Sequence, residues 1–107
     1  MIEKILCSAV WFPLIPLKKE IKDNCNPINI NQGLVFIGFR HCHCIYTMCS
    51  ITGLAQHEAG GNEIQGFLTN KNRFVTREEA ANIALRENQI KNLDRFNGVK
   101  LYSEDLY

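Results

Sequence analysis

This sequence has neither a long apolar run nor an excess of charge of one sign. No stretch of apolar residues approaches the roughly 20 residues that a helix needs to cross a membrane. The 12 basic and 11 acidic side chains leave a formal net charge of +1. Such an even balance provides no broad positive field, and this argues against binding to a nucleic-acid polymer. Any site for phosphate groups must therefore be local.

The N-terminal residues show none of the features of a signal peptide. They lack a basic start, an apolar stretch and a small-residue cleavage site in that order. We therefore expect a cytoplasmic protein with no membrane partner, in a compartment where thiols stay reduced. Because reduced cysteines prefer protein interiors, buried free thiols are the favoured interpretation of the cysteines. There are five of them, at Cys7, Cys25, Cys42, Cys44 and Cys49.

Common catalytic signatures are missing as well. The sequence contains no Walker loop, no GxGxxG after a strand, no HExxH and no GxSxG. No pair of acidic residues stands out for acid–base catalysis. These absences favour a binding protein over an enzyme, and we expect no cofactor.

The residues that are present predict a single α/β domain over 1–107. An apolar and β-branched run predicts a strand over 5–12, and a long loop follows over 13–32, where all three prolines lie. Residues 33–39 are apolar on both faces, which is typical of a central strand covered on two sides. A third strand is expected over 64–69.

Two main helices are expected to cover this sheet. The first follows from apolar residues at helical spacing between Cys44 and Ile51, with Gly53 at its C-terminal cap. The second begins with the capping box of Thr76 and Glu79 and continues with the apolar stripe Ala80, Ala81, Ala84 and Leu85. The predicted fold is a single small sheet of three to five strands, mixed or antiparallel, covered by helices.

Residues 40–44, with the sequence Arg-His-Cys-His-Cys, form the first candidate site. Zinc needs about four converging ligands, whereas alternate residues of a strand face opposite ways, so we expect no metal. A Cys–His nucleophile would need an orienting group and an oxyanion site that the sequence does not suggest. The structural alternative is a strand-to-helix junction with packed thiols. The functional alternative is an anion site at Arg40 and His41, since a helix N-terminus binds phosphate.

Residues 66–79 form the second candidate site. Arg73 and Arg77 could hold phosphate oxygens in a forked geometry next to the N-terminus of the capped helix. Phe67 or Phe74 could stack on a base, and Asn70, Asn72 and Glu78 could bind ribose hydroxyls. The structural alternative is a solvated surface, which is the usual setting of arginines near a capped helix.

Together these segments resemble phage-encoded anti-Thoeris proteins of the first described type, often called signal sponges. The similarity runs from about Ile5 to the C-terminus, apart from the loop at 13–32. It rests on Arg40-His41 with Cys44-Ile45, on Gln65-Gly66-Phe67-Leu68-Thr69, on Asn72-Arg73-Phe74-Val75-x-Arg77-Glu78-Glu79-Ala80, and on Leu101-Tyr102-Ser103-Glu104-Asp105-Leu106. The helix-leading motif and the C-terminal motif are the specific parts.

The resemblance implies a protein of the infected host cytoplasm that sequesters cyclic ADP-ribose isomers without cleaving them. It also implies an oligomer built from dimers and, in some members, a second site for cyclic oligonucleotides. Arg40, Arg73 and Arg77 are the positions at which this motif and the electrostatics agree. Two other functions stay open: a small nucleotide hydrolase, and a protein-binding inhibitor of a host factor.

Association with other copies is also expected from the residues themselves. A short chain buries a limited core, and closed symmetry is the usual way to bury the surface that remains. We expect at least a dimer, with exposed aromatic side chains at Trp11, Phe12, Tyr102 and Tyr107.

Overall fold

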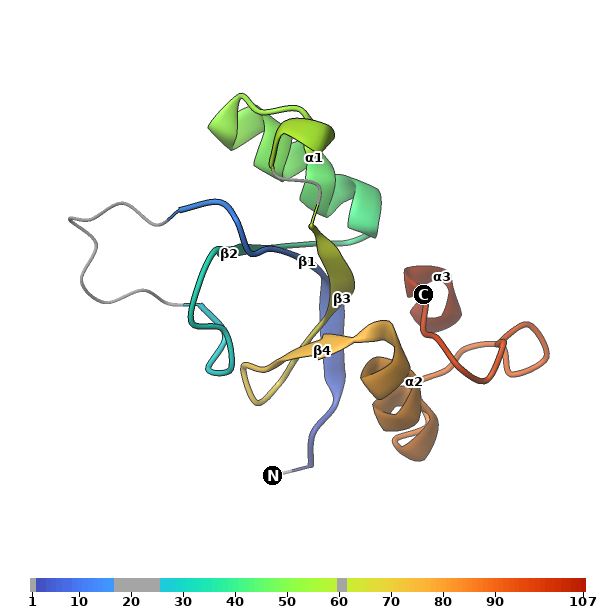
Figure 1. The fold of residues 1–107 in the computed structure, drawn as a ribbon. Coiled ribbons are helices and arrows are strands. Elements are labelled where there is room, and N and C mark those ends of the chain that lie inside the picture. The colour runs from blue at the N-terminus through green and yellow to red at the C-terminus, as the bar shows by residue number, and fades with distance from the viewer. Residues whose placement is uncertain (1, 17–25, 60–61) are drawn as a thin grey trace.

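A computed structural model describes residues 2–16, 26–59 and 62–107. Within these residues the strands are β1 (Ile5–Phe12), β2 (Leu34–Gly38), β3 (Ile64–Thr69) and β4 (Phe74–Thr76). The helices are α1 (His41–Thr52), α2 (Arg77–Arg86) and α3 (Ser103–Leu106), with a short 3-10 helix, η1, at Gln56–Ala59 (Figure 1). The strands form one antiparallel sheet in the order β2-β1-β3-β4. The predicted α/β class, with one small sheet and two main helices, is confirmed.

Both main helices pack on the same face of the sheet. Ser8 of β1 lies opposite Phe67 of β3, so Val10 and Phe12 share the face of Phe67 and Val75. Val10 and Phe12 pack with Cys44 and Met48 of α1. Phe67 and Val75 pack with the small residues Ala80, Ala81 and Ala84 of α2, together with Ile83. Thus α1 covers β1 and β2, whereas α2 covers β3 and β4.

The opposite face of the sheet is covered in part by residues 26–30. Ile30 packs on Ala9 and Phe74, and Trp11, Val35 and Leu68 lie partly exposed around this cluster. The side-chain amide of Asn29 donates to the carbonyl oxygen of Phe74 (2.7 Å) and accepts from its N–H (2.8 Å). Asn29 therefore binds the outer edge of β4 much as a neighbouring strand would.

The helix ends agree with the sequence prediction in most respects. Gly53 adopts the left-handed conformation (φ 74°) and its N–H donates to Cys49, as expected of a C-terminal cap. The hydroxyl of Thr76 accepts from the N–H of Glu79 at 3.3 Å, which confirms one half of the predicted capping box. The carboxylate of Glu79 instead contacts Arg73 at 3.6 Å.

Some predictions need correction. Residues 33–39 do not form a central strand: β2 is an edge strand, and its second apolar face includes Ile37, which is 52% exposed. Apolar residues on both faces do not distinguish a central strand from an edge strand here. One face of β2 is covered by α1, and its other face continues the partly open surface of the sheet. Phe12 is buried under α1 rather than exposed. Leu85 is exposed, and Ile83 takes its place in the buried stripe of α2.

Some predictions fall only partly on described residues. Of the loop at 13–32, residues 13–16 and 26–32 are described, and the rest, with Cys25, lies outside the described residues. Among the described cysteines, Cys44 is buried, Cys7 and Cys49 are partly buried, and Cys42 is exposed; all are free thiols. None of the helices in the described ranges is long and apolar enough to cross a membrane.

Candidate functional site

Three segments that are distant in the sequence meet around one hollow. Arg40 directly precedes α1, Arg77 is the first residue of α2, and Tyr102 directly precedes α3. Together they line an open hollow of about 370 Å³, which we call the arginine hollow. It is lined by Arg40, His41, Cys42, Arg77, Tyr102, Ser103 and Glu104. The arrangement brings two guanidinium groups to one place.

Arg77 is a partly buried cation without a nearby counter-charge. Its terminal nitrogens donate to the carbonyl oxygen of Leu101 (2.8 Å) and to Oε1 of Gln65 (2.7 Å), and the ring of Tyr102 lies 4.4 Å from its guanidinium carbon. No carboxylate of the described residues comes within 4.0 Å of it. Burial lowers the pKa of Arg77, and more distant carboxylates, such as that of Glu104, oppose this shift.

Arg40 holds the C-terminal segment in place. Its guanidinium donates to Ser103 Oγ (3.0 Å) and to the backbone oxygen of Tyr107 (2.7 Å). It lies over the rings of Phe39 and Tyr107, which stack on each other at 4.7 Å. The carboxylate of Glu104 approaches Arg40 to 3.7 Å but is itself largely exposed. Arg40 is therefore better compensated than Arg77.

His41 lines the hollow and is held by a hydrogen bond to β3. Its Nε2 lies 2.8 Å from the carbonyl oxygen of Gly66, and because a carbonyl can only accept, Nε2 carries the proton. The ring stands edge-on to Phe67. Burial lowers the pKa of His41, an effect that the hydrogen bond to Gly66 opposes. His41 thus ties the first turn of α1 to β3.

The two main helices differ in charge at their N-terminal turns. The first turn of α1 contains no acidic residue, whereas that of α2 contains Glu78 and Glu79. The N–H groups of a first turn have no partner within the helix, and they carry a partial positive charge. The N-terminus of α1 therefore adds to the positive potential of the arginine hollow.

A second hollow of about 420 Å³ lies on the other side of Arg77. Glu78, predicted as a ribose ligand, is here, with its carboxylate 4.0 Å from the ammonium group of Lys100. The hollow is lined by Glu63, Ile64, Gln65, Thr76, Arg77, Glu78 and Lys100. Arg77 is therefore shared by both hollows.

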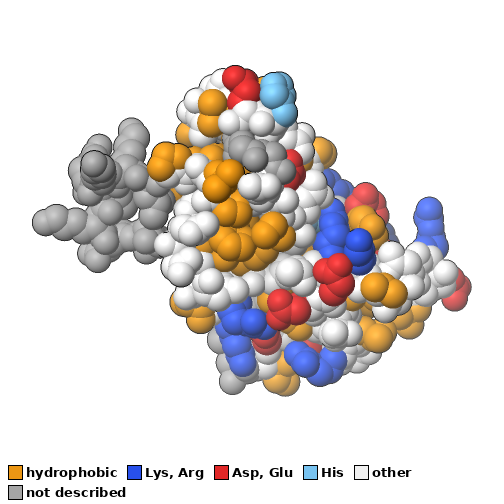
Figure 2. All heavy atoms as spheres, in the orientation of Figure 1, with side chains coloured by type: hydrophobic (Ala, Val, Ile, Leu, Met, Phe, Trp, Pro, Cys, Tyr) orange, Lys and Arg blue, Asp and Glu red, His pale blue; other side chains and the backbone are white. Residues whose placement is uncertain are grey.

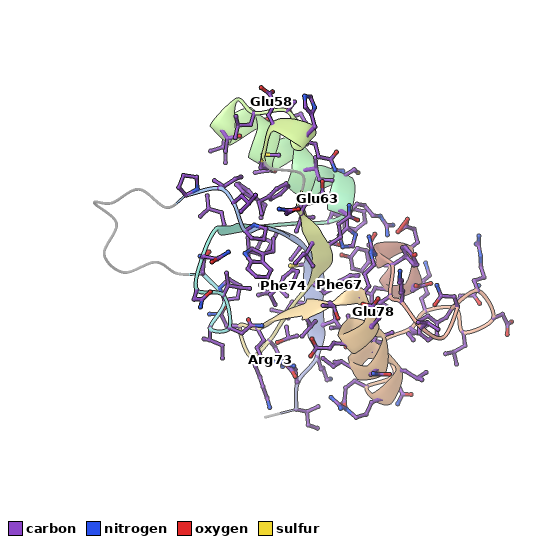
Figure 3. The ribbon with its side chains drawn as sticks, viewed as in Figure 1. Glu58, Glu63, Phe67, Arg73, Phe74 and Glu78 are labelled. Atoms are coloured by element: carbon purple, nitrogen blue, oxygen red, sulfur yellow. The ribbon has the colours of Figure 1, made fainter. Side chains whose placement is uncertain are left out.

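The remaining predicted site residues lie elsewhere. Figure 3 shows Arg73 and Glu78 at opposite ends of β4. Arg73 pairs with Glu3, and both polar atoms of the Asn70 side chain bind the backbone near the N-terminus: Oδ1 accepts from Lys4 (2.8 Å) and Nδ2 donates to Ile2 (2.9 Å).

The two predicted stacking residues lie in the core. Phe67 is 0% and Phe74 4% exposed, so neither ring has a free face on which a base could stack. Their burial follows from the sheet: Phe67 points towards α2 and Phe74 lies under Ile30. Of the predicted set, the structure brings Arg40, His41 and Arg77 together and places Glu78 beside them.

The sequence reasoning missed the contribution of the C-terminal motif to the site. Tyr102, Ser103 and Glu104 line the arginine hollow, and Gln65 binds Arg77. In the sequence, the functional signal of the Leu-Tyr-Ser-Glu-Asp-Leu segment is its resemblance to the signal sponges. No spacing rule connects it with residues 40 or 77, because the contact depends on the path of residues 87–100.

The cysteines near the hollow differ in their surroundings: Cys42 is exposed and lines the hollow, whereas Cys44 is buried. No group of three or more histidine, cysteine or acidic side chains in the described ranges could hold a metal ion. Burial raises the pKa of the Cys44 thiol to about 12, so this thiol stays protonated at neutral pH. Cys44 packs against Val10 and Met48, as a small apolar side chain would.

Comparison with known proteins gives one match. No curated protein and no solved structure matches the chain. A family model described as phage T4 y16D protein matches residues 4–107. Because this match spans nearly the whole sequence, the chain belongs to the phage T4 y16D protein family.

Proposed function

We propose that this protein binds a small phosphorylated signal in the arginine hollow and holds it without cleaving it. The ligand class is cyclic ADP-ribose and its isomers, and the role is counter-defence by a phage protein in the infected host cytoplasm. Sequestration removes the signal from the effector that it would activate. The protein then acts by stoichiometry and needs no turnover.

The observation that carries this proposal is that Arg77, which is partly buried, has no carboxylate within 4.0 Å among the described residues. A partly buried cation is normally paired with an anion, because leaving water without a counter-charge costs free energy. Arg77 has only neutral acceptors at hydrogen-bond distance, namely Leu101 and Gln65. A phosphate group in the hollow would supply the missing negative charge. The remaining N–H groups of the guanidinium are available to donate to it.

Two features of the hollow favour a ligand with a pyrophosphate group. Arg40 lines the same hollow and adds a second guanidinium. The N-terminal turn of α1, with no acidic side chain, adds further positive potential. Cyclic ADP-ribose isomers carry two adjacent phosphates, which matches two arginines. The resemblance of the helix-leading and C-terminal motifs supports the same ligand class, and membership of a phage protein family fits a role in counter-defence.

The residues around the hollow also favour binding without catalysis. His41 donates a hydrogen bond from Nε2 to the carbonyl oxygen of Gly66, so in the neutral ring the lone pair lies on Nδ1. Glu104 is the only carboxylate among the described residues that line the hollow, so it has no acidic partner there for acid–base work. The presence of a single carboxylate in the described lining disfavours the small nucleotide hydrolase. No specific observation favours the protein-binding inhibitor.

The test is to recover the ligand after binding. The protein is mixed with a small molar excess of cyclic ADP-ribose isomers over binding sites, freed of unbound ligand and denatured by heat. The released nucleotides are then identified by mass spectrometry. We expect about one unchanged ligand for each site. A linear ADP-ribose product would favour the hydrolase, and the absence of any nucleotide would reject the proposal. A parallel sample with cyclic oligonucleotides tests for a second ligand class.

A further inference from the structure

The two edges of the sheet differ in how they are closed. At the β4 edge, the Asn29 amide binds both backbone groups of Phe74, and the N–H of Ile28 donates to the carbonyl oxygen of Asn72 (2.8 Å). At the other edge, β2 pairs with β1 on one side only, and no described residue pairs with its outer side (Figure 1). Among the residues that the structure describes, the β4 edge is thus closed and the β2 edge is open.

The open edge has none of the devices that normally prevent strand pairing. Exposed edges in native proteins usually carry a lysine, a proline or a bulge, because free N–H and C=O groups recruit other strands. The strand Leu34–Gly38 reads Leu-Val-Phe-Ile-Gly, with no charge, no proline and an unbroken register against β1. Ile37 is 52% exposed, and Phe39, just beyond the strand, is 56% exposed. Such an edge is suited to burial against another strand.

We propose that β2 pairs antiparallel with β2 of a second copy of this chain, so that the two sheets join into one. With the two-fold axis at Phe36, Phe36 lies opposite its own copy, Val35 lies opposite Ile37, and Leu34 lies opposite Gly38. All these cross-strand pairs are apolar, and no charged side chain takes part in the pairing. A strand that complements itself in this way fits the closed symmetry of a dimer.

The sheet faces on either side of this edge support the same partner. Val35 continues the partly exposed apolar face that includes Trp11 and Leu68. Apolar side chains also gather on the face turned to the viewer in Figure 2, below α1. Joining the β2 strands would make this face continuous across the two copies. Leu34 and Phe36 lie on the α1 side, so α1 of each copy would approach the axis.

The experiment measures association and its location together. Sedimentation of the full chain between about 1 and 100 µM should give a mass that approaches twice 12.3 kDa. A lysine at an edge position opposes strand pairing, so Ile37→Lys should raise the dimer dissociation constant at least about tenfold. Leu93→Lys is the matched control, because Leu93 is also exposed (63%) but lies outside β2, and it should leave the constant unchanged. Circular dichroism confirms that both variants are folded.

Hydrogen exchange identifies the strand itself. In the parent, backbone amides of residues 34–38 should exchange more slowly at 100 µM than at 1 µM. In Ile37→Lys they should exchange at the same rate at both concentrations. A parent that stays monomeric over this range overturns the proposal. So does a dimer whose 34–38 amides are not protected, or one that Leu93→Lys weakens as strongly as Ile37→Lys. None of these outcomes depends on ligand binding, so the proposed function is tested separately.

Discussion

The guanidinium of Arg73 donates two hydrogen bonds to the carboxylate of Glu3, from Nε to Oε2 at 2.9 Å and from Nη2 to Oε1 at 3.0 Å. The hydroxyl of Thr69 donates to the same Oε2 at 2.7 Å. These contacts tie the segment before β1 to the β3–β4 hairpin. The charge of Arg73 is therefore compensated within the chain, in contrast to that of Arg77.

This ion pair predicts a specific loss of stability in acid. The hydrogen bond from Arg73 lowers the pKa of Glu3 from 4.5 to about 2. Because the folded-state pKa is depressed, the pair stabilises the fold fully above about pH 4.5, and the stabilisation is lost as the pH falls towards 2. We expect the free energy of unfolding to fall between pH 5 and 2 by about 1–2 kcal/mol more in the parent than in Glu3→Gln.

Urea unfolding of the two proteins at a series of pH values provides the measurement. At neutral pH Glu3→Gln should be less stable than the parent, and the difference should shrink on acidification. Parallel pH profiles would mean that the pair adds nothing to folding.

Substitution by alanine should cost much more stability at Gly66 than at Gly98. A Cβ at Gly66 would lie 2.1 Å from the carbonyl oxygen of Val75 and 2.8 Å from the ring of Phe74. Gly66→Ala should therefore force β3 and β4 apart and cost about 3 kcal/mol or more. At Gly98 (φ 84°) a Cβ would meet nothing within 4 Å, so Gly98→Ala should cost only about 1 kcal/mol of backbone strain. Chemical unfolding curves compare them, and equal costs would contradict the tight packing of β3 against β4.

Removal of the negative charge of Glu104 should increase the affinity for the ligand. The carboxylate of Glu104 lines the arginine hollow, and a hydrogen bond from Ser103 lowers its pKa. It is therefore negatively charged at neutral pH and repels a phosphate group. Because the side chain is 73% exposed, the repulsion is screened and small. Glu104→Gln should tighten the binding of a cyclic ADP-ribose isomer about two- to fivefold in low salt, as followed by calorimetry. Weaker binding would indicate that the carboxylate contacts the ligand directly.

The sequence predicts the elements of this fold better than their positions in the sheet. The helices were recognisable because Gly53 and Thr76 carry local capping signals. The edge position of β2 was not, since apolar residues on both faces describe a covered central strand as well as an open edge. The short strand β4 was missed, because its three residues, Phe74–Thr76, are held by pairing with β3 and by Asn29, which lies far away in the sequence.

The candidate site was predictable only in part for the same reason. By residue type and local spacing, Arg73 and Arg77 are equivalent. Only the fold gives Arg73 an ion pair with Glu3 and leaves Arg77 with no carboxylate within 4.0 Å among the described residues. Likewise, Phe67 and Phe74 were suitable stacking residues by type, but strand alternation directs them into the two clusters of the core. Tertiary contacts, rather than residue chemistry, decide which groups remain available to a ligand.

The most direct test of the account is calorimetric titration of the folded parent, Arg77→Ala and Arg73→Ala with the same cyclic ADP-ribose isomer. A sponge must compete with a sensor, so we expect a dissociation constant for the parent in the nanomolar range, which corresponds to about 12 kcal/mol. Arg77→Ala should weaken binding at least about thirtyfold, or about 2 kcal/mol, whereas Arg73→Ala should bind within about threefold of the parent. Full affinity in Arg77→Ala would contradict the arginine hollow as the ligand site.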